Sequence, residues 1–120
     1  MALVLVIDDY EDTRAVVQKL LERRGLQTLG TDTGEAAIAL LVTEKPNVII
    51  VDGMMPGMNG IEFIRIVRAN VETASIPIIL YTAISDQTFL DNAIEKGANE
   101  ICVKGSHDIG KILECVDRYV

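Results

Sequence analysis

The sequence predicts a three-layer α/β/α domain, in which a doubly wound, five-stranded parallel sheet lies between two layers of helices. Five short apolar runs alternate with five helical patterns along the chain, which gives the order (βα)5. Most of these runs are nearly continuous rather than alternating, as in strands that are buried on both faces. The 120 residues fit a single domain, 1–120, whereas an eight-stranded barrel would need about twice that length.

The predicted strands consist mainly of branched aliphatic residues. Consecutive parallel strands need a crossover long enough to hold a helix, and right-handed crossovers place helices on both faces of the sheet. We therefore expect one buried sheet with helices packed on each side. In chain order, the predicted strands are Leu3–Ile7, Leu26–Gly30, Val48–Val51, Ile76–Tyr81 and Ile101–Val103.

Sequence signals mark the boundaries of the predicted helices. The first helix, Asp12–Arg24, is followed by Gly25, and Gly97 ends the fourth, because glycine adopts the backbone conformation that commonly closes a helix. A Ser, Thr or Asn side chain can accept a hydrogen bond from a free backbone N–H at a helix start. The caps predicted on this basis for the second to fifth helices are Thr33, Asn59, Ser85 and Ser106.

Composition and charge narrow the classes of protein. Eleven basic and eighteen acidic residues give a net charge of −7, so direct binding to nucleic acid or to a membrane surface is not expected. Two cysteines, Cys102 and Cys115, are too few for a disulfide framework and favour a reduced, cytoplasmic protein. The apolar N-terminal run lacks a basic segment and leads directly into Asp8 and Asp9, which predicts a strand rather than a signal peptide.

Polar side chains follow four of the five predicted strands. Asp8 and Asp9 follow the first strand, Asp52 the third, Thr82 the fourth and Lys104 the fifth. Because functional groups of an open parallel sheet gather beyond the carboxyl ends of its strands, we expect these side chains to meet at one edge. Capping needs alone do not explain three carboxylates, a hydroxyl and an ammonium at one edge.

The expected cluster has the chemistry of a phosphoryl-transfer site. Three nearby carboxylates repel one another, and Lys104 supplies only one positive charge, so a hard divalent cation with oxygen ligands is expected, with Mg²⁺ the usual choice. No His or Cys is placed to make a zinc site. Asp52 is the candidate nucleophile toward phosphorus, while Lys104 and the Thr82 hydroxyl can contact phosphoryl oxygens.

These residues give the chain its resemblance to a known family. The acidic pair Asp8-Asp9, the stretch 52–60, the pair Thr82-Ala83 and Lys104, in this order and spacing, resemble the motif of response-regulator receiver domains. These domains are the phospho-accepting half of two-component signalling, and their fold is flavodoxin-like. The resemblance covers essentially all 120 residues.

The resemblance implies a role for each residue of the motif. Asp52 would accept a phosphoryl group from a phosphohistidine on a histidine kinase or a histidine phosphotransfer protein. Asp9 and Asp52 would bind Mg²⁺ directly, Asp8 largely through water, and the Met54 carbonyl would be a further ligand. Thr82 and Lys104 would contact the phosphate.

The resemblance also implies how the signal leaves the domain. Thr82 would move toward the phosphoryl group, the following loop would follow it, and the surface made by the fourth helix, fifth strand and fifth helix would change. A downstream effector protein or a tethered output domain would bind there. Such a domain catalyses at most its own phosphorylation and slow dephosphorylation, and is not otherwise an enzyme.

The chain departs from the family pattern at four positions. Ile101 stands where many members carry an aromatic residue that couples to the Thr, and Gly105 replaces a common proline, which predicts a trans peptide bond and a looser turn. Met54 and Ile84 are apolar where polar residues are frequent. Both flank the route of water to the acyl phosphate, so we expect slow self-hydrolysis.

Two other classes of protein stay open on the sequence. A receiver-like scaffold that binds partners without phosphorylation is compatible with Ile101 and Gly105. A small enzyme, either an aspartyl-phosphate phosphohydrolase or a flavin-binding redox domain, is disfavoured by Met54, which replaces a second acid, and by acids where a flavin phosphate would bind. The chain ends after the fifth predicted helix without an output segment, which predicts a stand-alone regulator or a receiver from a longer protein.

Overall fold

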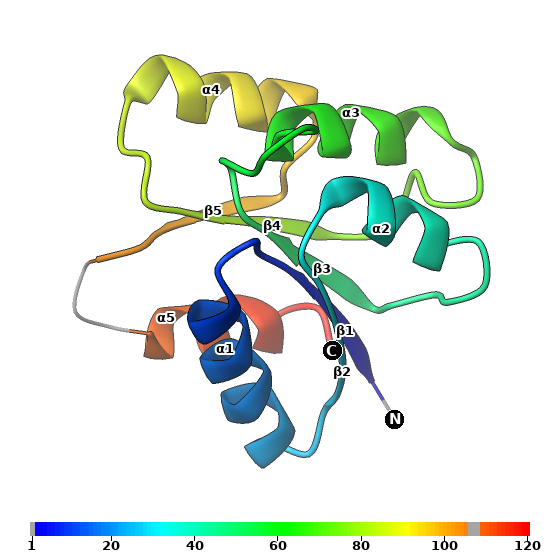
Figure 1. Ribbon diagram of the computed structural model, residues 1–120, viewed down its shortest axis with the longest axis vertical. Coiled ribbons are helices and arrows are strands. Elements are labelled where there is room, and N and C mark those ends of the chain that lie inside the picture. The colour runs from blue at the N-terminus through cyan, green and yellow to red at the C-terminus, as the bar shows by residue number, and fades with distance from the viewer. Residues whose placement is uncertain (1, 106–108) are drawn as a thin grey trace.

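The computed structural model describes residues 2–105 and 109–120 and confirms the predicted fold class. All strand pairs are parallel, and the strand order is β2-β1-β3-β4-β5 (Figure 1). Ligands of such sheets bind where the order reverses, which here is the crevice between β1 and β3. The elements are β1 Leu3–Ile7, α1 Glu11–Arg23, β2 Gln27–Thr31, α2 Gly34–Leu40, β3 Val48–Val51, α3 Gly60–Ala69, β4 Ile78–Thr82, α4 Gln87–Lys96, β5 Glu100–Val103 and α5 Gly110–Asp117.

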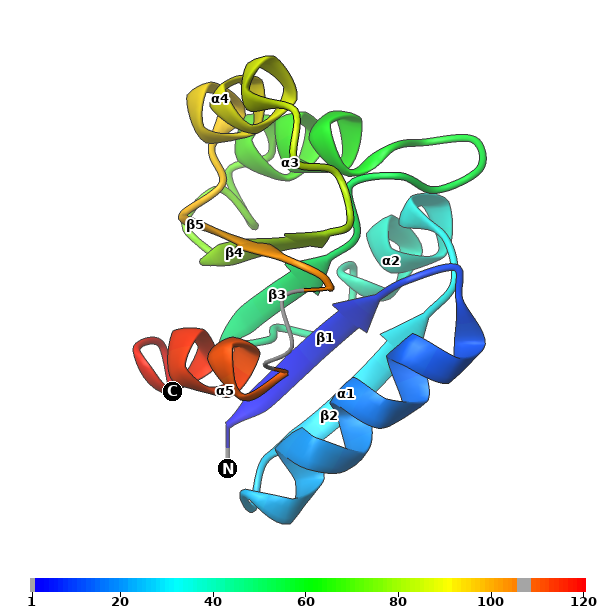
Figure 2. The same cartoon turned by 90° about the vertical axis from the view of Figure 1, so that its left-hand side faces the viewer.

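The helices form two layers on opposite faces of the sheet. Helices α2, α3 and α4 cover one face, and α1 and α5 cover the other (Figure 1 and Figure 2). Each face has its own apolar core, and neighbouring strand residues alternate between the two: Ile49 and Val51 pack toward α3, while Val48 and Ile50 pack toward α1 and α5. This alternation explains why the central strands are apolar at nearly every position.

Side-chain caps fix the starts of three helices. Thr33 and Asn59 cap α2 and α3 as predicted, and each accepts the backbone N–H of the residue three positions further on. The prediction of Ser85 as the cap of α4 is wrong, because Asp86 fills this role one residue later. A carboxylate at this position also interacts favourably with the positive end of the helix dipole. The predicted cap Ser106 lies outside the described residues.

The predicted starts of β2 and β4 are also wrong, because turn hydrogen bonds engage the residues concerned. Strand β2 begins at Gln27 rather than Leu26, since the Leu26 N–H closes the end of α1 by donating to the Leu21 carbonyl at 3.2 Å. Strand β4 begins two residues later than predicted, at Ile78, since the Ile76 N–H donates to a carbonyl of the preceding turn. Each of these two strands also ends one residue later than predicted.

Smaller shifts affect other boundaries. Helix α1 begins and ends one residue earlier than predicted, and β5 begins one residue earlier, at Glu100, which pairs with Ile79 of β4. No peptide bond among residues 2–105 and 109–120 is cis, so the predicted trans bond before Gly105 is confirmed. Gly105 has a φ of 85°, a conformation that favours glycine.

The structure also describes the two cysteines and the lengths of the helices. Both Cys102 and Cys115 are free thiols, and the cytoplasmic location expected from them stays a prediction. Within the part of the chain that the structure describes, none of the helices is both long enough and apolar enough to cross a membrane.

Candidate functional site

The adjacent strands β1 and β3 bring the acidic residues together. Ile7 and Val51 are paired at the strand ends, so the next residues, Asp8 and Asp52, leave the sheet side by side. The Asp52 N–H donates to the Ile7 carbonyl at 2.9 Å, which continues the ladder to the first residue beyond the strand. One carboxylate oxygen from each of Asp8, Asp9 and Asp52 lies within 4.8 Å of the other two. The predicted convergence of these acids is therefore present.

Lys104 reaches this cluster from the end of β5. Its Nζ lies 2.7 Å from Asp8 Oδ2 and 3.4 Å from Asp52 Oδ2. The Lys104 N–H donates to the Thr82 carbonyl at 2.7 Å, which fixes the backbone from which the side chain extends. The ammonium also lies 5.3 Å from the centre of the Tyr81 ring, within the range of a cation–π contact.

Burial and neighbouring charges shift the pKa values of two site residues. Burial raises the pKa of the Asp52 carboxyl, the Lys104 ammonium lowers it and the Asp8 charge raises it, with a raised pKa as the net result. Burial by itself would lower the pKa of Lys104, but its hydrogen bond to Asp8 and the charge of Asp52 outweigh this effect and raise it. Lys104 is therefore held in the charged form beside two carboxylates.

The donor set of the cluster fits a hard divalent cation. Three carboxylates face a single ammonium, which leaves an excess of negative charge in a largely buried site. Asp8 and Asp52 are buried, whereas Asp9 is exposed, so the cluster opens to solvent on the Asp9 side. Oxygen ligands without sulfur or imidazole are those that Mg²⁺, Ca²⁺ and Mn²⁺ prefer.

The Thr82 hydroxyl lies close to the backbone that follows Asp52. Thr82 is fully buried, and a Cβ atom placed on Gly53 would lie only 2.8 Å from Thr82 Oγ1. The hydroxyl accepts the Ile84 N–H at 3.1 Å, which ties it to the loop before α4. The side chain is thus beside the acidic cluster, with its oxygen bound to the loop rather than to Asp52.

Met54 and Gly60 complete the loop around Asp52. The Met54 side chain is exposed, and its N–H lies 3.4 Å from Asp52 Oδ1, so its backbone stays next to the carboxylate. A Cβ atom on Gly60 would lie 2.4 Å from the Asp52 carbonyl oxygen, and the Gly60 N–H donates to the Gly53 carbonyl at 3.0 Å. Glycine at the start of α3 therefore allows the helix to approach the acidic edge.

Two neighbours of the site were not predicted. Arg14 on α1 donates from Nη1 to the Asp8 carbonyl at 2.7 Å. Its place in the first turns of the helix that follows β1 is a signal that could have revealed it. Phe89 on α4 lies beside Gly53 and Thr82. No local pattern reveals this contact, because it depends on the missing side chain at Gly53.

The raised pKa of Asp52 predicts a gain in stability when its charge is removed. The folded state holds the Asp52 proton more tightly than the unfolded chain does, so ionisation of Asp52 lowers the free energy of unfolding as pH rises through the folded-state pKa. In Mg²⁺-free buffer, Asp52→Asn is expected to unfold at higher urea concentration than wild type at pH 7. This difference should vanish below about pH 4.

The matched control for this stability prediction is Asp91→Asn, which removes an exposed carboxylate of α4. It is expected to leave the urea midpoint near that of wild type at both pH values. An Asp52→Asn protein that is less stable than wild type at pH 7 would contradict the prediction.

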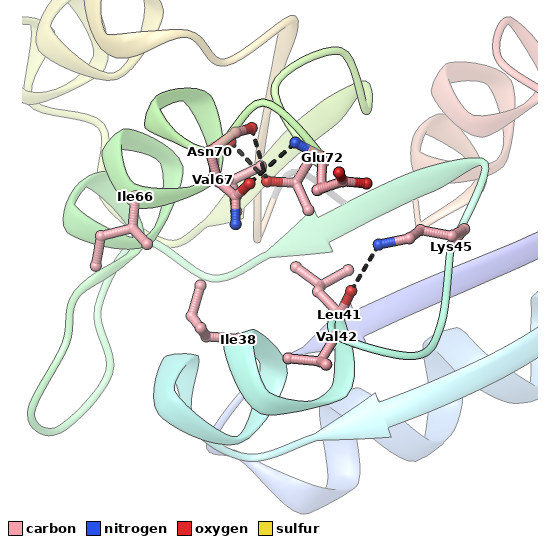
Figure 3. Close-up of a pocket in the computed structure, with 9 residues that line it drawn as sticks. Ile38, Leu41, Val42, Lys45, Ile66, Val67, Asn70 and Glu72 are labelled. Atoms are coloured by element: carbon pink, nitrogen blue, oxygen red, sulfur yellow. Dashed lines mark hydrogen bonds between the residues drawn. The ribbon is translucent and has the colours of Figure 1, made fainter.

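An apolar pocket of about 330 Å³ lies away from the acidic cluster. It is formed where α2 and α3 end, at the edge of the sheet where β3 and β4 begin. Figure 3 shows its aliphatic side chains, which come from both helices. Because the acidic residues lie at the opposite edge, this pocket does not belong to the candidate site. Its lining residues are Ile38, Leu41, Val42, Lys45, Ile66, Val67, Asn70, Glu72 and Thr73.

Comparison with known proteins identifies the family of this site. A family model described as response regulator receiver domain matches residues 4–117. Protein PilH of Pseudomonas aeruginosa is 33% identical over 104 residues, which cover 87% of this chain and 86% of PilH. The phosphate regulon transcriptional regulatory protein PhoB of the same species is also 33% identical, over 84% of this chain but only 44% of PhoB. The chain thus spans less than half the length of that relative.

A solved structure agrees with these matches. The response regulator protein TrrA from Thermotoga maritima, in complex with Mg(2+)-BeF, has a TM-score of 0.88 and 28% sequence identity, and the match covers 100% of both chains. The fold, the family model and the relatives thus indicate the same family. The chain therefore belongs to the response regulator receiver domains of two-component systems.

Proposed function

We propose that Asp52 accepts a phosphoryl group from a phosphohistidine on a histidine kinase or a histidine phosphotransfer protein. The observation that carries this proposal is that the Asp52 carboxylate lies 3.4 Å from Lys104 Nζ and has an oxygen within 4.8 Å of oxygens of Asp8 and Asp9. Charge on the phosphoryl oxygens needs cations to balance it, and this arrangement provides one ammonium and ligands for a second cation.

The second cation in this proposal is Mg²⁺. Asp9 and Asp52 would hold it directly, Asp8 largely through water, and the Met54 carbonyl would be a further ligand. When bound, Mg²⁺ would neutralise negative charge on the acids and on a phosphoryl oxygen. The fit rests on the all-oxygen donor set and its excess negative charge. TrrA, a relative of the same fold, was solved with Mg(2+)-BeF.

Each protein residue has a defined part in the transfer step. An oxygen of Asp52 forms a bond to phosphorus while the bond from phosphorus to the donor imidazole nitrogen breaks, and the imidazole keeps that electron pair and is reprotonated. Lys104 pairs with one phosphoryl oxygen, and the Thr82 hydroxyl donates a hydrogen bond to another. The domain thereby catalyses its own phosphorylation and, slowly, its dephosphorylation.

The phosphorylated state would be read through one surface of a single receiver domain that spans residues 1–120. Movement of Thr82 would release the Ile84 N–H and with it the loop before α4. The surface formed by α4, β5 and α5 would then bind a downstream effector protein or a tethered output domain, as a shift in population toward the binding-competent conformation. The partner in this proposal is a protein and not a nucleic acid.

The proposal is tested by intact-mass measurement after incubation with acetyl phosphate and Mg²⁺. Wild type should gain the mass of one phosphoryl group, and Asp52→Asn should gain none. Asp91→Asn, the exposed matched control, should gain the same mass as wild type. Absence of a mass gain in wild type would contradict phosphorylation and favour a scaffold that acts without it. A full gain in Asp52→Asn would contradict Asp52 as the acceptor.

The acyl phosphate at Asp52 is expected to hydrolyse slowly. The exposed Met54 and the half-buried Ile84 stand two positions after Asp52 and Thr82. They would flank the route of water to the acceptor, and neither side chain can orient a water molecule by a hydrogen bond. The double variant Met54→Asn, Ile84→Glu should lose its phosphoryl group faster than wild type. The measurement is the decay of the phosphorylated mass after removal of acetyl phosphate, and equal decay rates would contradict this account.

A further inference from the structure

An aromatic side chain of α4 lies against the backbone that follows the proposed phosphoryl acceptor. A Cβ atom placed on Gly53 would lie 3.0 Å from both Cε2 and Cζ of Phe89 and 2.8 Å from Thr82 Oγ1. The ring and the hydroxyl therefore both border the same small space. Because Gly53 has no side chain, the Phe89 ring occupies the space that a side chain at this position would need.

Phe89 also belongs to the start of α4. Its N–H donates to the cap residue Asp86 at 3.1 Å, and its ring is half-buried against the apolar core under α3 and α4. Of the ten residues of α4, Ala93 is the buried one, whereas α3 buries four of ten. The position of α4 on the sheet thus depends more than that of α3 on partly buried side chains such as Phe89.

In the proposed phosphorylated state, the Thr82 hydroxyl turns toward the phosphoryl group on Asp52, and this turn changes its surroundings. It is buried and accepts the Ile84 N–H, so a turn toward Asp52 breaks this hydrogen bond. The turn also changes the space beside Gly53 that the Phe89 ring fills. Protein interiors are close-packed, and a gap or an overlap next to the half-buried ring is costly, so we expect the ring to move when the hydroxyl moves.

We propose that Phe89 is the positioning residue that couples Thr82 to α4 in this chain. This inference rests on the proposed phosphorylation of Asp52 and adds the route by which it changes the surface of α4. The coupling aromatic residue is then on α4 rather than on β5, where this chain has Ile101. Phe89 makes the coupling through the space beside Gly53 that its ring and the Thr82 hydroxyl both border, and it does not itself touch the transferred group.

Fluorine NMR tests the coupling directly, because the chain contains two phenylalanines, Phe63 and Phe89. Both are replaced by 4-fluorophenylalanine in the full chain, and the two resonances are assigned with Phe89→Leu. Phe63 is fully buried in α3 and serves as the internal reference. After addition of acetyl phosphate and Mg²⁺, the Phe89 resonance is expected to shift, while the Phe63 resonance stays close to its starting position.

Two variants of Thr82 separate coupling from a general effect of the added charge. Thr82→Val keeps the shape but removes the hydroxyl, so its phosphorylated form should show the Phe89 resonance at the unphosphorylated position. Thr82→Ser keeps the hydroxyl and should restore the shift. A residue with a purely structural role would not give a shift that depends on both the phosphoryl group and the hydroxyl.

Gly53→Ala gives an independent check without phosphorylation. The added methyl group would lie 3.0 Å from the Phe89 ring, so it must displace the ring or the Thr82 hydroxyl. If the hydroxyl moves, the ring is expected to move with it. The Phe89 resonance should therefore move in the untreated variant. An unchanged resonance would show that the contact on which the inference rests is absent.

Intact mass distinguishes the failure of this inference from that of the proposed function. A phosphorylated wild-type protein with an unshifted Phe89 resonance would overturn the coupling and leave phosphorylation of Asp52 standing. The same holds for a shift that persists in phosphorylated Thr82→Val. A wild-type protein that gains no mass would overturn the proposed function and this inference together.

Discussion

Replacement of Lys104 by methionine is expected to slow phosphorylation of Asp52 by acetyl phosphate by at least about a hundredfold, the usual effect of losing one preorganised donor to a developing charge. Lys104 Nζ lies 2.7 Å from Asp8 and 3.4 Å from Asp52, so the ammonium is in place before a phosphoryl group arrives. Methionine fills a similar volume without the charge. The rate of mass gain at saturating Mg²⁺ is the measurement.

A measurement of Mg²⁺ binding distinguishes this catalytic effect from a loss of the folded structure. Removal of the ammonium takes away a competing positive charge, so Lys104→Met should bind Mg²⁺ at least as tightly as wild type in a calorimetric titration. Lys45→Met, at the opposite edge of the sheet, is the matched control and should phosphorylate at the wild-type rate. A wild-type rate in Lys104→Met would contradict the role proposed for Lys104.

Replacement of Arg68 by methionine is expected to lower the free energy of unfolding by roughly 2–4 kcal/mol, because several partly buried acceptors lose a charged donor at once. The guanidinium donates to the carbonyls of Ala74 at 3.0 Å and Ile76 at 2.7 Å, and to the Gly97 carbonyl from two nitrogens at 2.9 and 3.1 Å. It also donates to Asn99 Oδ1 at 2.8 Å. One side chain thus ties α3 to the loops before β4 and β5.

Urea unfolding monitored by circular dichroism measures this loss. Arg65→Met is the matched control on the same helix, because Arg65 is exposed, and it should change stability by no more than about 0.5 kcal/mol. Equal stabilities of the Arg68 and Arg65 variants would contradict the role given to the guanidinium. The residues proposed to transfer the phosphoryl group lie at the other edge of the sheet from the loops that Arg68 binds, so the folded variant should still accept a phosphoryl group.

The strands and the acidic edge were predictable because their signals are local and the topological rule is general. A continuous apolar run such as Val48–Val51 indicates a strand buried on both faces, and a parallel sheet places the residue after each strand at one edge. This rule brought Asp8 and Lys104 together although they are 96 positions apart in the chain. No pairing of the strands had to be known in advance.

Other features of the fold and the site depend on contacts that no local sequence pattern indicates. Leu26 and Ile76 look like strand residues, but turn hydrogen bonds engage their N–H groups. Arg68 binds groups 29 and 31 positions further along the chain, and nothing in the sequence around it indicates them. The Phe89 contact is possible because Gly53 has no side chain, and it can be recognised only once the position of α4 is known.

The most direct test of the central claim is chemical identification of the modified residue. An acyl phosphate is reduced by borohydride to an alcohol, so a phosphorylated aspartate becomes homoserine, which peptide mass spectrometry can locate. After acetyl phosphate and Mg²⁺, homoserine is expected at position 52, and chelation of Mg²⁺ should abolish it. Homoserine at position 8 or 9 instead, or conversion of residue 52 that is indifferent to Mg²⁺, would contradict the account.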